Sequence, residues 1–282
     1  MYLDDATLDR WIREDVPYLD LTTHVLGIGG QPGRLTLRNR GGIVVCGTEE
    51  VARVLAKLGA TVEEFVPSGQ RAEPRTLLLA ATGSAGALHQ GWKIVVNILE
   101  YASGIATRTA ALVAAARAVA PHIEIVSTRK GFPGTRELAT KAVLAGGGSP
   151  HRLGLSETIL VFAQHRVFLE GGAEAFARQL PAWKAKSPEK TFLVEATGWD
   201  EALSAVRAGA DGVQFDKVPP AELARHVAAL RAERAGLVLI AAGGITPEDA
   251  AAYAATGVDA LATSTVYHGA PADIAATMVP QG

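Results

Sequence analysis

The sequence predicts a mixed α/β and α+β protein in two parts: an N-terminal α+β domain, then an open or incomplete (β/α) barrel of about six strands. In the first part, candidate strands and helices follow one another without a βαβ rhythm, as is typical of an α+β domain. From Ile123 onward, short β-branched runs alternate with helical segments, which indicates parallel strands joined by crossover helices. Because about six strands cannot close an eight-stranded barrel, we expect other structure to complete it. A doubly wound sheet is the lower-ranked alternative.

The expected elements of the first part follow from caps, alternation and glycine breaks. They are a helix at 4–13, a polar turn at 20–23, a hairpin at 34–45 interrupted by Gly41 and Gly42, a helix at 48–58 capped by Thr48, and strands at 61–66 and 76–81. Apolar residues at helical spacing then predict a bridging helix over 90–120, with Gly104 as its break.

The second part is expected to repeat one strand and one helix. The candidate strands are 123–127, 158–163, 192–196, 212–215, 237–242 and 260–265. The candidate helices between them are 135–145, 173–179, 201–208, 221–233 and 247–255.

Composition narrows the class of protein. The chain has 282 residues, 48% of them hydrophobic and 20% charged, so it can bury a substantial core. A formal net charge of -2 argues against a nucleic-acid-binding protein, which usually has a basic face. The single cysteine, Cys46, allows no internal disulfide, so we expect a reducing cytoplasm and a small buried thiol. The acidic N-terminus is unlike a signal peptide, and no apolar run approaches the roughly 20 residues of a membrane span.

Cations follow the first strand of the repeat region. Arg129 and Lys130 come directly after it, and His151 and Arg152 follow the next glycine-rich loop. In a parallel barrel, strand ends and their loops form one mouth, where ligands bind. Fixed cations there call for an anionic substrate. The plainer interpretation of each pair is a solvated salt bridge.

Carboxylates follow two consecutive strands. Glu195 lies near the end of the strand FLVEA and Asp216 at the end of VQFD, so we expect their side chains to be neighbours. Carboxylates beside phosphates usually hold Mg²⁺ or ribose hydroxyls. Ion pairing with the arginines and lysines of the same mouth is the alternative.

A glycine turn, Gly243-Gly244, joins the fifth strand to a helix expected to start near Pro247. Glycines let backbone N–H groups approach an anion closely, and a helix dipole strengthens such a site. Barrels often bind phosphate at the loops after their last strands, so Ser264 would supply the second arm.

Together these residues resemble the quinolinate phosphoribosyltransferase family (nicotinate-nucleotide pyrophosphorylase, carboxylating). The matching pieces are Asp20-Leu-Thr-Thr23, Asn97, Ser103-Gly-Ile-Ala-Thr107, Thr128-Arg-Lys130, Pro133-Gly134, Gly146-Gly-Gly148, His151-Arg-Leu-Gly-Leu155, Glu195, Asp216, Gly243-Gly244 and His268. They occur in family order over nearly the whole chain. The stretch SETILVFAQH looks like the ModD subgroup, pyrophosphorylase-like proteins associated with molybdenum transport.

The resemblance implies a fold and a reaction. The fold is an open-faced α/β sandwich domain at 1–110 with a bridging helix, an incomplete barrel with the active site at 111–266, and a tail at 267–282 that packs back on the first domain. The reaction is that of a pentosyltransferase, which joins a pyridine-type carboxylate to phosphoribosyl pyrophosphate (PRPP) with Mg²⁺ and releases pyrophosphate and CO₂. The family forms homodimers, or hexamers built from dimers, with shared active sites.

The family's site residues carry over by position. Arg129, Lys130, His151 and Arg152 would contact the substrate carboxylates and PRPP, with Lys130 and Arg152 also neutralising the departing pyrophosphate. Glu195 and Asp216 would hold ribose hydroxyls or Mg²⁺. The 5′-phosphate would lie against Ala242, Gly243, Gly244 and Ser264, and His268 belongs to the same matching set.

Two positions depart from the family pattern. The family has a lysine in a Leu-Ile-Lys-Asp-Asn-His stretch, where this chain reads Leu160-Val-Phe-Ala-Gln-His165, so Phe162 replaces that cation. Lys93 replaces an arginine that reaches into the partner's site. Losing a cation should weaken binding of a dianionic ring by at least ~1.5–3 kcal/mol, which puts quinolinate in doubt as the acceptor.

Two other functions compete with this hypothesis. A Schiff-base aldolase would use Lys130 as its nucleophile at a strand end. A sensor of anions or nucleotides would keep the scaffold without turnover, and Phe162 favours that reading.

Overall fold

The computed structural model describes residues 1–281, except for the side chains of 172–174. The chain divides into two compact units. Unit 1 contains Met1–Ala110, Phe132–Gly147 and the chain from Tyr267 onward, and unit 2 contains Ala111–Gly131 and Gly148–Val266. The segment Phe132–Gly147 therefore groups with unit 1, although the sequence places it within the barrel region.

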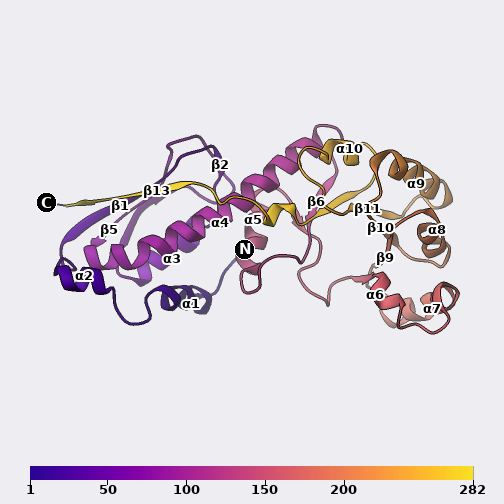
Figure 1. The fold of residues 1–282 in the computed structure, drawn as a ribbon, viewed down its shortest axis with the longest axis horizontal. Coiled ribbons are helices and arrows are strands. Elements are labelled where there is room, and N and C mark those ends of the chain that lie inside the picture. The colour runs from indigo at the N-terminus through magenta and orange to yellow at the C-terminus, as the bar shows by residue number, and fades with distance from the viewer. Residues whose placement is uncertain (282) are drawn as a thin grey trace. The chain divides into compact units, whose positions relative to one another are not determined.

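Unit 1 is built on an antiparallel sheet of four strands in the order β13-β1-β5-β3. Its strands are β1 (Pro32–Asn39), β3 (Thr61–Phe65), β5 (Leu77–Ser84) and β13 (Ile274–Pro280). The C-terminal strand β13 pairs with β1 along its length, as Figure 1 shows in yellow beside indigo. The helices are α1 (Asp5–Asp15), α2 (Leu21–Leu26), α3 (Thr48–Lys57), α4 (Ala85–Arg117) and α5 (Arg136–Ala145), of which α4 continues into unit 2.

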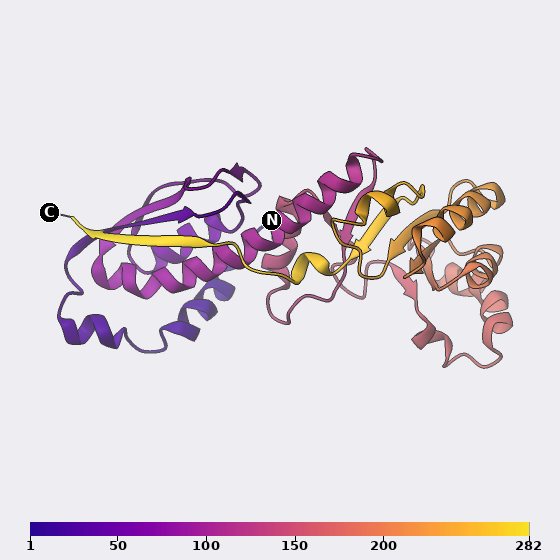
Figure 2. The ribbon, with the colours of Figure 1, turned by 45° about the horizontal axis from the view of Figure 1, so that its top comes forward.

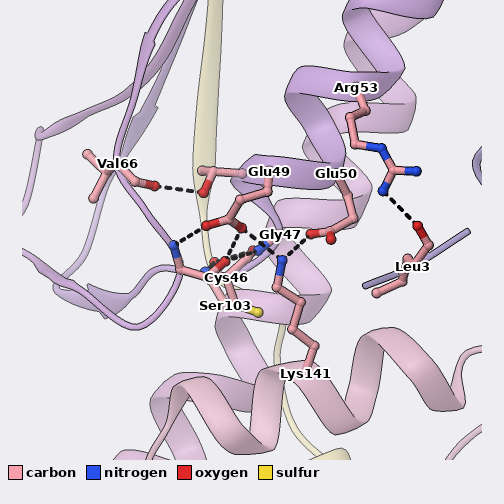
Figure 3. Close-up of polar contacts among 11 residues, drawn as sticks. Leu3, Cys46, Gly47, Glu49, Glu50, Arg53, Val66, Ser103 and Lys141 are labelled. Atoms are coloured by element: carbon pink, nitrogen blue, oxygen red, sulfur yellow. Dashed lines mark hydrogen bonds and ion pairs between the residues drawn. The ribbon is translucent and has the colours of Figure 1, made fainter. Parts of the chain in front are cut away.

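Helix α5 belongs to unit 1 because its apolar face is buried there. Leu138 and Ala142 join the same core as Val51, Val54 and Leu55 of α3. Lys141 adds ion pairs to two glutamates of α3 (Figure 3). A Cβ on Gly146 would lie 2.4 Å from the carbonyl oxygen of Ala106, so glycine is needed where the end of α5 meets α4.

Four expectations for unit 1 are wrong. Thr48 does not cap α3, because Gly47 is the N-cap and the Thr48 hydroxyl donates to the carbonyl oxygen of Val66 at 2.6 Å. The hairpin at 34–45 does not form, because β2 (Ile43–Val44) pairs with β4 (Arg71–Ala72) instead of β1. The turn at 20–23 begins α2, since Asp20 caps it by accepting a hydrogen bond from the Thr23 amide at 3.2 Å. Helix α4 runs through Gly104 without a break. A Cβ at Gly104 would lie 3.1–3.2 Å from the backbone of residues 270–272, so this glycine permits a close approach.

Unit 2 is a curled half-barrel of seven parallel strands in the order β7-β6-β12-β11-β10-β9-β8. The strands are β6 (Glu124–Ser127), β7 (Ser149–Pro150), β8 (Ile159–Val161), β9 (Phe192–Ala196), β10 (Gly212–Asp216), β11 (Val238–Ala242) and β12 (Ala260–Thr263). The six expected strands are present. The seventh, β7, has two residues and too little pattern to be predicted.

The helices of unit 2 are α6 (Ala163–Arg166), α7 (Gly172–Lys186), α8 (Trp199–Arg207), α9 (Pro220–Glu233) and α10 (Ala250–Ala254). Figures 1 and 2 show α7 to α9, in pink to orange, along one side of the strands. There, Phe176 and Leu180 of α7 pack with Phe192 and Val194 of β9.

Alternate residues of the same strands form the concave inner face. This inner layer consists of Leu160, Leu193, Ile240, Ala242, Ala260 and Ala262, with Val126 and Phe162 packed against it. In the described part of the chain, no helix has both the length and the apolar character needed to cross a membrane.

Candidate active site

The carboxyl ends of the unit 2 strands lie along one edge of the half-barrel, which we call the mouth. Going along the chain, it collects Arg129 and Lys130 after β6, His151 and Arg152 after β7, Phe162 after β8, Glu195 at the end of β9, Asp216 at the end of β10, Gly243 and Gly244 after β11, and Ser264 after β12. All these residues belong to unit 2, so their gathering follows from the parallel sheet alone.

The cations come from two adjoining loops. Strands β6 and β7 pair in parallel, and the amide of His151 donates to the carbonyl oxygen of Ser127 at 2.8 Å. Arg129 and Lys130 are exposed, whereas Arg152 is only 9% exposed. Burial, and then repulsion by Arg129, lower the pKa of the Arg152 guanidinium, with Glu157 acting in the opposite direction. A bound anion between these charges would relieve that repulsion.

His151 lies next to Arg152 in the loop after β7. Burial lowers the pKa of its imidazole, and the positive charge of Arg152 lowers it further. The nearby Gln214 amide offsets part of this effect. Nevertheless, Nε2 of His151 is buried and makes no hydrogen bond to any described residue. A buried ring nitrogen without a partner is suited to bind a substrate group.

The carboxylates lie on neighbouring strands. Glu195 of β9 is in register with Gln214 of β10, two residues before Asp216. Burial raises the pKa of Glu195, and the charge of Asp216 raises it again, against the opposing effects of Gln214, Arg166 and Lys130. Two carboxylates that repel each other beside a cluster of cations can share a metal ion or bind hydroxyl groups.

Gln214 is a residue of this site that sequence reasoning missed. Its Nε2 donates to Oε2 of Glu195 at 3.1 Å, and its side chain is buried. The available signal was a glutamine inside the otherwise apolar strand VQFD.

The glycine turn after β11 is conformationally demanding. Gly243 has φ +107°, and a Cβ there would lie 2.5 Å from Cγ of Lys217. Gly244 has φ +77° and opens into free space. The hydroxyls of Thr263 and Thr265 both donate to the carbonyl of Ile245 at 2.8 Å, which ties this turn to the end of β12.

The expected helix start near Pro247 is wrong. Helix α10 begins at Ala250 and has five residues, because Asp249 accepts the amide of Thr246 at 2.7 Å and a turn precedes the helix. An anion at this turn would therefore meet glycine amides without the help of a helix dipole.

Phe162 adds an aromatic wall at the end of β8. Its ring stacks on the imidazole of His165, with centroids 5.6 Å apart and planes inclined by 26°. The Phe162 amide donates to Nδ1 of His165 at 2.9 Å, which fixes that ring. Since Val161 is in register with Val194, Phe162 lies next to Glu195 along the mouth.

Two predicted residues lie in unit 1. Lys93 is exposed on α4, with Nζ 4.4 Å from the ring centroid of Trp92, and His268 is exposed near the start of the C-terminal segment. Their roles toward the mouth stay predictions.

Family models cover almost the whole chain. The N-terminal domain of quinolinate phosphoribosyl transferase matches residues 20–103, and its C-terminal domain matches residues 105–275. The chain belongs to the quinolinate phosphoribosyltransferase family. This confirms the resemblance inferred from the motifs.

The relatives of this chain differ in how similar their sequences are to it. A Rhodobacter capsulatus protein named "Putative pyrophosphorylase ModD" is 46% identical over 88% of this chain and 95% of its own length. The human nicotinate-nucleotide pyrophosphorylase [carboxylating] is 31% identical over 95% of this chain and 88% of its own. The crystal structure of NadC from Streptococcus pyogenes superposes with a TM-score of 0.88 at 24% identity, covering 100% of both chains, and shares the fold.

Proposed function

We propose that this protein transfers the phosphoribosyl group of PRPP to an aromatic carboxylate and releases pyrophosphate. Its family is one of phosphoribosyltransferases. The observation that carries the proposal is the buried Arg152, whose guanidinium is repelled by that of Arg129, at the same edge as two carboxylates. A substrate that has both phosphoryl groups and ribose hydroxyls can bind the cations of this mouth through its phosphoryl groups and the carboxylates through its hydroxyls.

Each half has its own part in the reaction. Arg129, Lys130 and Arg152 would hold the pyrophosphate, while Gly243, Gly244, Ala242 and Ser264 would receive the 5′-phosphate. The bond between ribose C1′ and the pyrophosphate oxygen breaks, and pyrophosphate leaves with the bonding electrons. An acceptor ring nitrogen then donates an electron pair to C1′, through a transition state with oxocarbenium character. Fixing both partners in line and neutralising the leaving group lowers the barrier.

Magnesium fits the carboxylate half. The charge of Asp216 raises the pKa of Glu195, so a divalent cation near both would remove an existing repulsion. Among the described residues, no group of three or more His, Cys, Asp or Glu side chains could hold a metal. Two carboxylates therefore suit an ion that arrives with the diphosphate and neutralises its charge, with water and phosphate oxygens as further ligands.

The acceptor is defined by Phe162. Its ring, held by His165, offers a stacking surface and no charge. At this position the site has no cation to pair with the second carboxylate of a pyridine dicarboxylate. This favours an aromatic acid with fewer charges than quinolinate. Decarboxylation after transfer would then require a carboxylate next to the ring nitrogen.

We further propose that the protein is a cytoplasmic homodimer in which Lys93 reaches into the partner's active site.

A screen of aromatic acids for PRPP-dependent pyrophosphate release tests this function. The expected result is release with at least one acid, and its loss in Arg152→Met. Isothermal titration with PRPP and Mg²⁺ should give heat without any acceptor. No heat at millimolar PRPP would refute the proposal. Binding without release from any acid would instead support a sensor, and borohydride trapping of Lys130 by a sugar phosphate would support an aldolase.

A further inference from the structure

Gln214 is a polar side chain within the apolar inner layer of the half-barrel. It is 7% exposed, and its neighbours in register are Glu195 on β9 and Ile240 on β11. Leu193, Ala242 and Ala260 of the same layer are aliphatic. A buried amide is unfavourable unless its hydrogen bonds are satisfied, and an aliphatic residue or methionine would suit this layer better. The glutamine therefore calls for a role other than packing.

The amide of Gln214 affects two groups of the mouth. Its Nε2 donates to Oε2 of Glu195 at 3.1 Å, and in the described part of the chain no other side chain donates a hydrogen bond to that carboxylate. The same amide partly offsets the lowering of the pKa of His151, whose imidazole enters from the loop after β7. Strands β7 and β9 are far apart in the strand order, so Gln214 relates two site residues that the sheet itself does not pair.

Without this amide, Glu195 would be free to turn. Asp216 repels its carboxylate, while Arg166 and Lys130 attract it. An ion pair with either cation would withdraw the carboxylate from the substrate, or neutralise a cation that the anion needs.

We propose that Gln214 is a positioning residue, which holds the Glu195 carboxylate from the neighbouring strand so that it and His151 meet the same bound PRPP. This inference rests on the proposed function. We assign Gln214 itself no contact with the reacting atoms, because it is only 7% exposed and lies two residues before the end of β10.

Gln214→Met tests the inference with PRPP and Mg²⁺ as the probe. Methionine matches the length of glutamine and suits an apolar layer, so the thermal midpoint should be unchanged or higher. The PRPP dissociation constant, measured by isothermal titration, should rise by about tenfold. Thr256→Val is the matched control. Thr256 is also 7% exposed and lies in unit 2, but its hydroxyl donates a hydrogen bond to the carbonyl oxygen of Tyr253. The control should leave PRPP affinity unchanged.

A double-mutant cycle decides whether Gln214 acts through Glu195. In the Glu195→Gln background, adding Gln214→Met should change PRPP affinity by less than about twofold. A full, independent loss in that background would overturn the proposal. So would a large loss of stability in Gln214→Met, which would assign the residue a structural role, or unchanged PRPP affinity in a stable Gln214→Met. If the parent protein binds no PRPP, the proposed function itself fails, and this result differs from a parent that binds normally.

Discussion

Nζ of Lys141 lies 2.5 Å from Oε2 of Glu50 in the interior of unit 1, and 2.8 Å from Oε2 of Glu49 (Figure 3). Glu50 is 2% exposed and Lys141 is 9% exposed, so this pair is buried, whereas the side chain of Glu49 beside it is 36% exposed. A lysine on a predicted helix is usually solvated, but this face of α5 packs against α3 and gives Lys141 a structural role.

Removing the cation of this cluster should destabilise unit 1. Lys141→Met leaves the buried carboxylate of Glu50 without a partner, and breaking a buried pair in this way lowers the free energy of unfolding by about 3–5 kcal/mol. Urea denaturation measures the change. Lys190→Met is the control, because its pair with Glu189 is exposed and should contribute less than about 1 kcal/mol. Equal effects of the two substitutions would contradict the buried cluster.

The same cluster predicts acid sensitivity. Burial acts to raise the pKa of Glu49, but the ion pair with Lys141 and the hydrogen bonds from Ser68 outweigh it and lower the pKa from 4.5 to about 2. A carboxyl whose pKa is lower in the folded state contributes stability above its unfolded pKa, and this is lost as pH falls through the folded value. The thermal midpoint should therefore decrease as the pH is lowered from 4.5 to about 2. Glu49→Gln should flatten that fall; an unchanged slope would argue against the assignment.

Cys46 should be chemically inert in the folded protein. Burial raises the pKa of its thiol to about 12, and its side chain is fully buried in the core of unit 1. Because the thiolate is the reactive form, maleimide should label Cys46 only after unfolding. The measurement is labelling by mass against urea concentration, which should follow the unfolding curve. Rapid labelling in native buffer would show that unit 1 opens there.

The two glycines of the turn after β11 should differ in how much stability is lost when each is replaced by alanine. Gly243→Ala brings a Cβ to 2.5 Å from Cγ of Lys217 and 2.8 Å from its amide nitrogen, at φ +107°. Gly244→Ala meets no atom within 4 Å, so it should cost only the left-handed backbone preference of about 1 kcal/mol. We expect Gly243→Ala to cost more than about 2 kcal/mol and to weaken PRPP binding. The reverse order in thermal melts would disprove this view of the turn.

Phe162 should govern the choice of acceptor. Phe162→Lys adds a cation at the end of β8, so the preference for a pyridine dicarboxylate over a monocarboxylate should rise by about tenfold or more. Phe162→Leu removes the stacking on His165 without adding charge, and should weaken all aromatic acids together. Pyrophosphate release across an acid series gives both comparisons. A preference that is the same in all three proteins would remove Phe162 from acceptor selection.

Long periodic segments were predictable because their pattern of apolar and polar side chains indicates which face is buried. The strands β9 to β12 follow from apolar runs that end in Glu195, Asp216, Gly243 and Ser264, and a parallel sheet places such ends at one edge. Elements held by distant partners were not predictable. The pairing of β2 with β4 and the membership of α5 in unit 1 depend on contacts with residues far away in the chain.

The sequence by itself determined the family, the half-barrel and which side chains end its strands, because these depend on local pattern and ordered motifs. Tertiary structure alone decided that Lys141 is a buried cation and that Gln214 donates a hydrogen bond to Glu195. It also decided that helix α10 begins at Ala250 and not directly after the glycine turn. Burial, register and hydrogen-bond geometry arise only when separate strands and helices meet, and no local pattern encodes the distance between them.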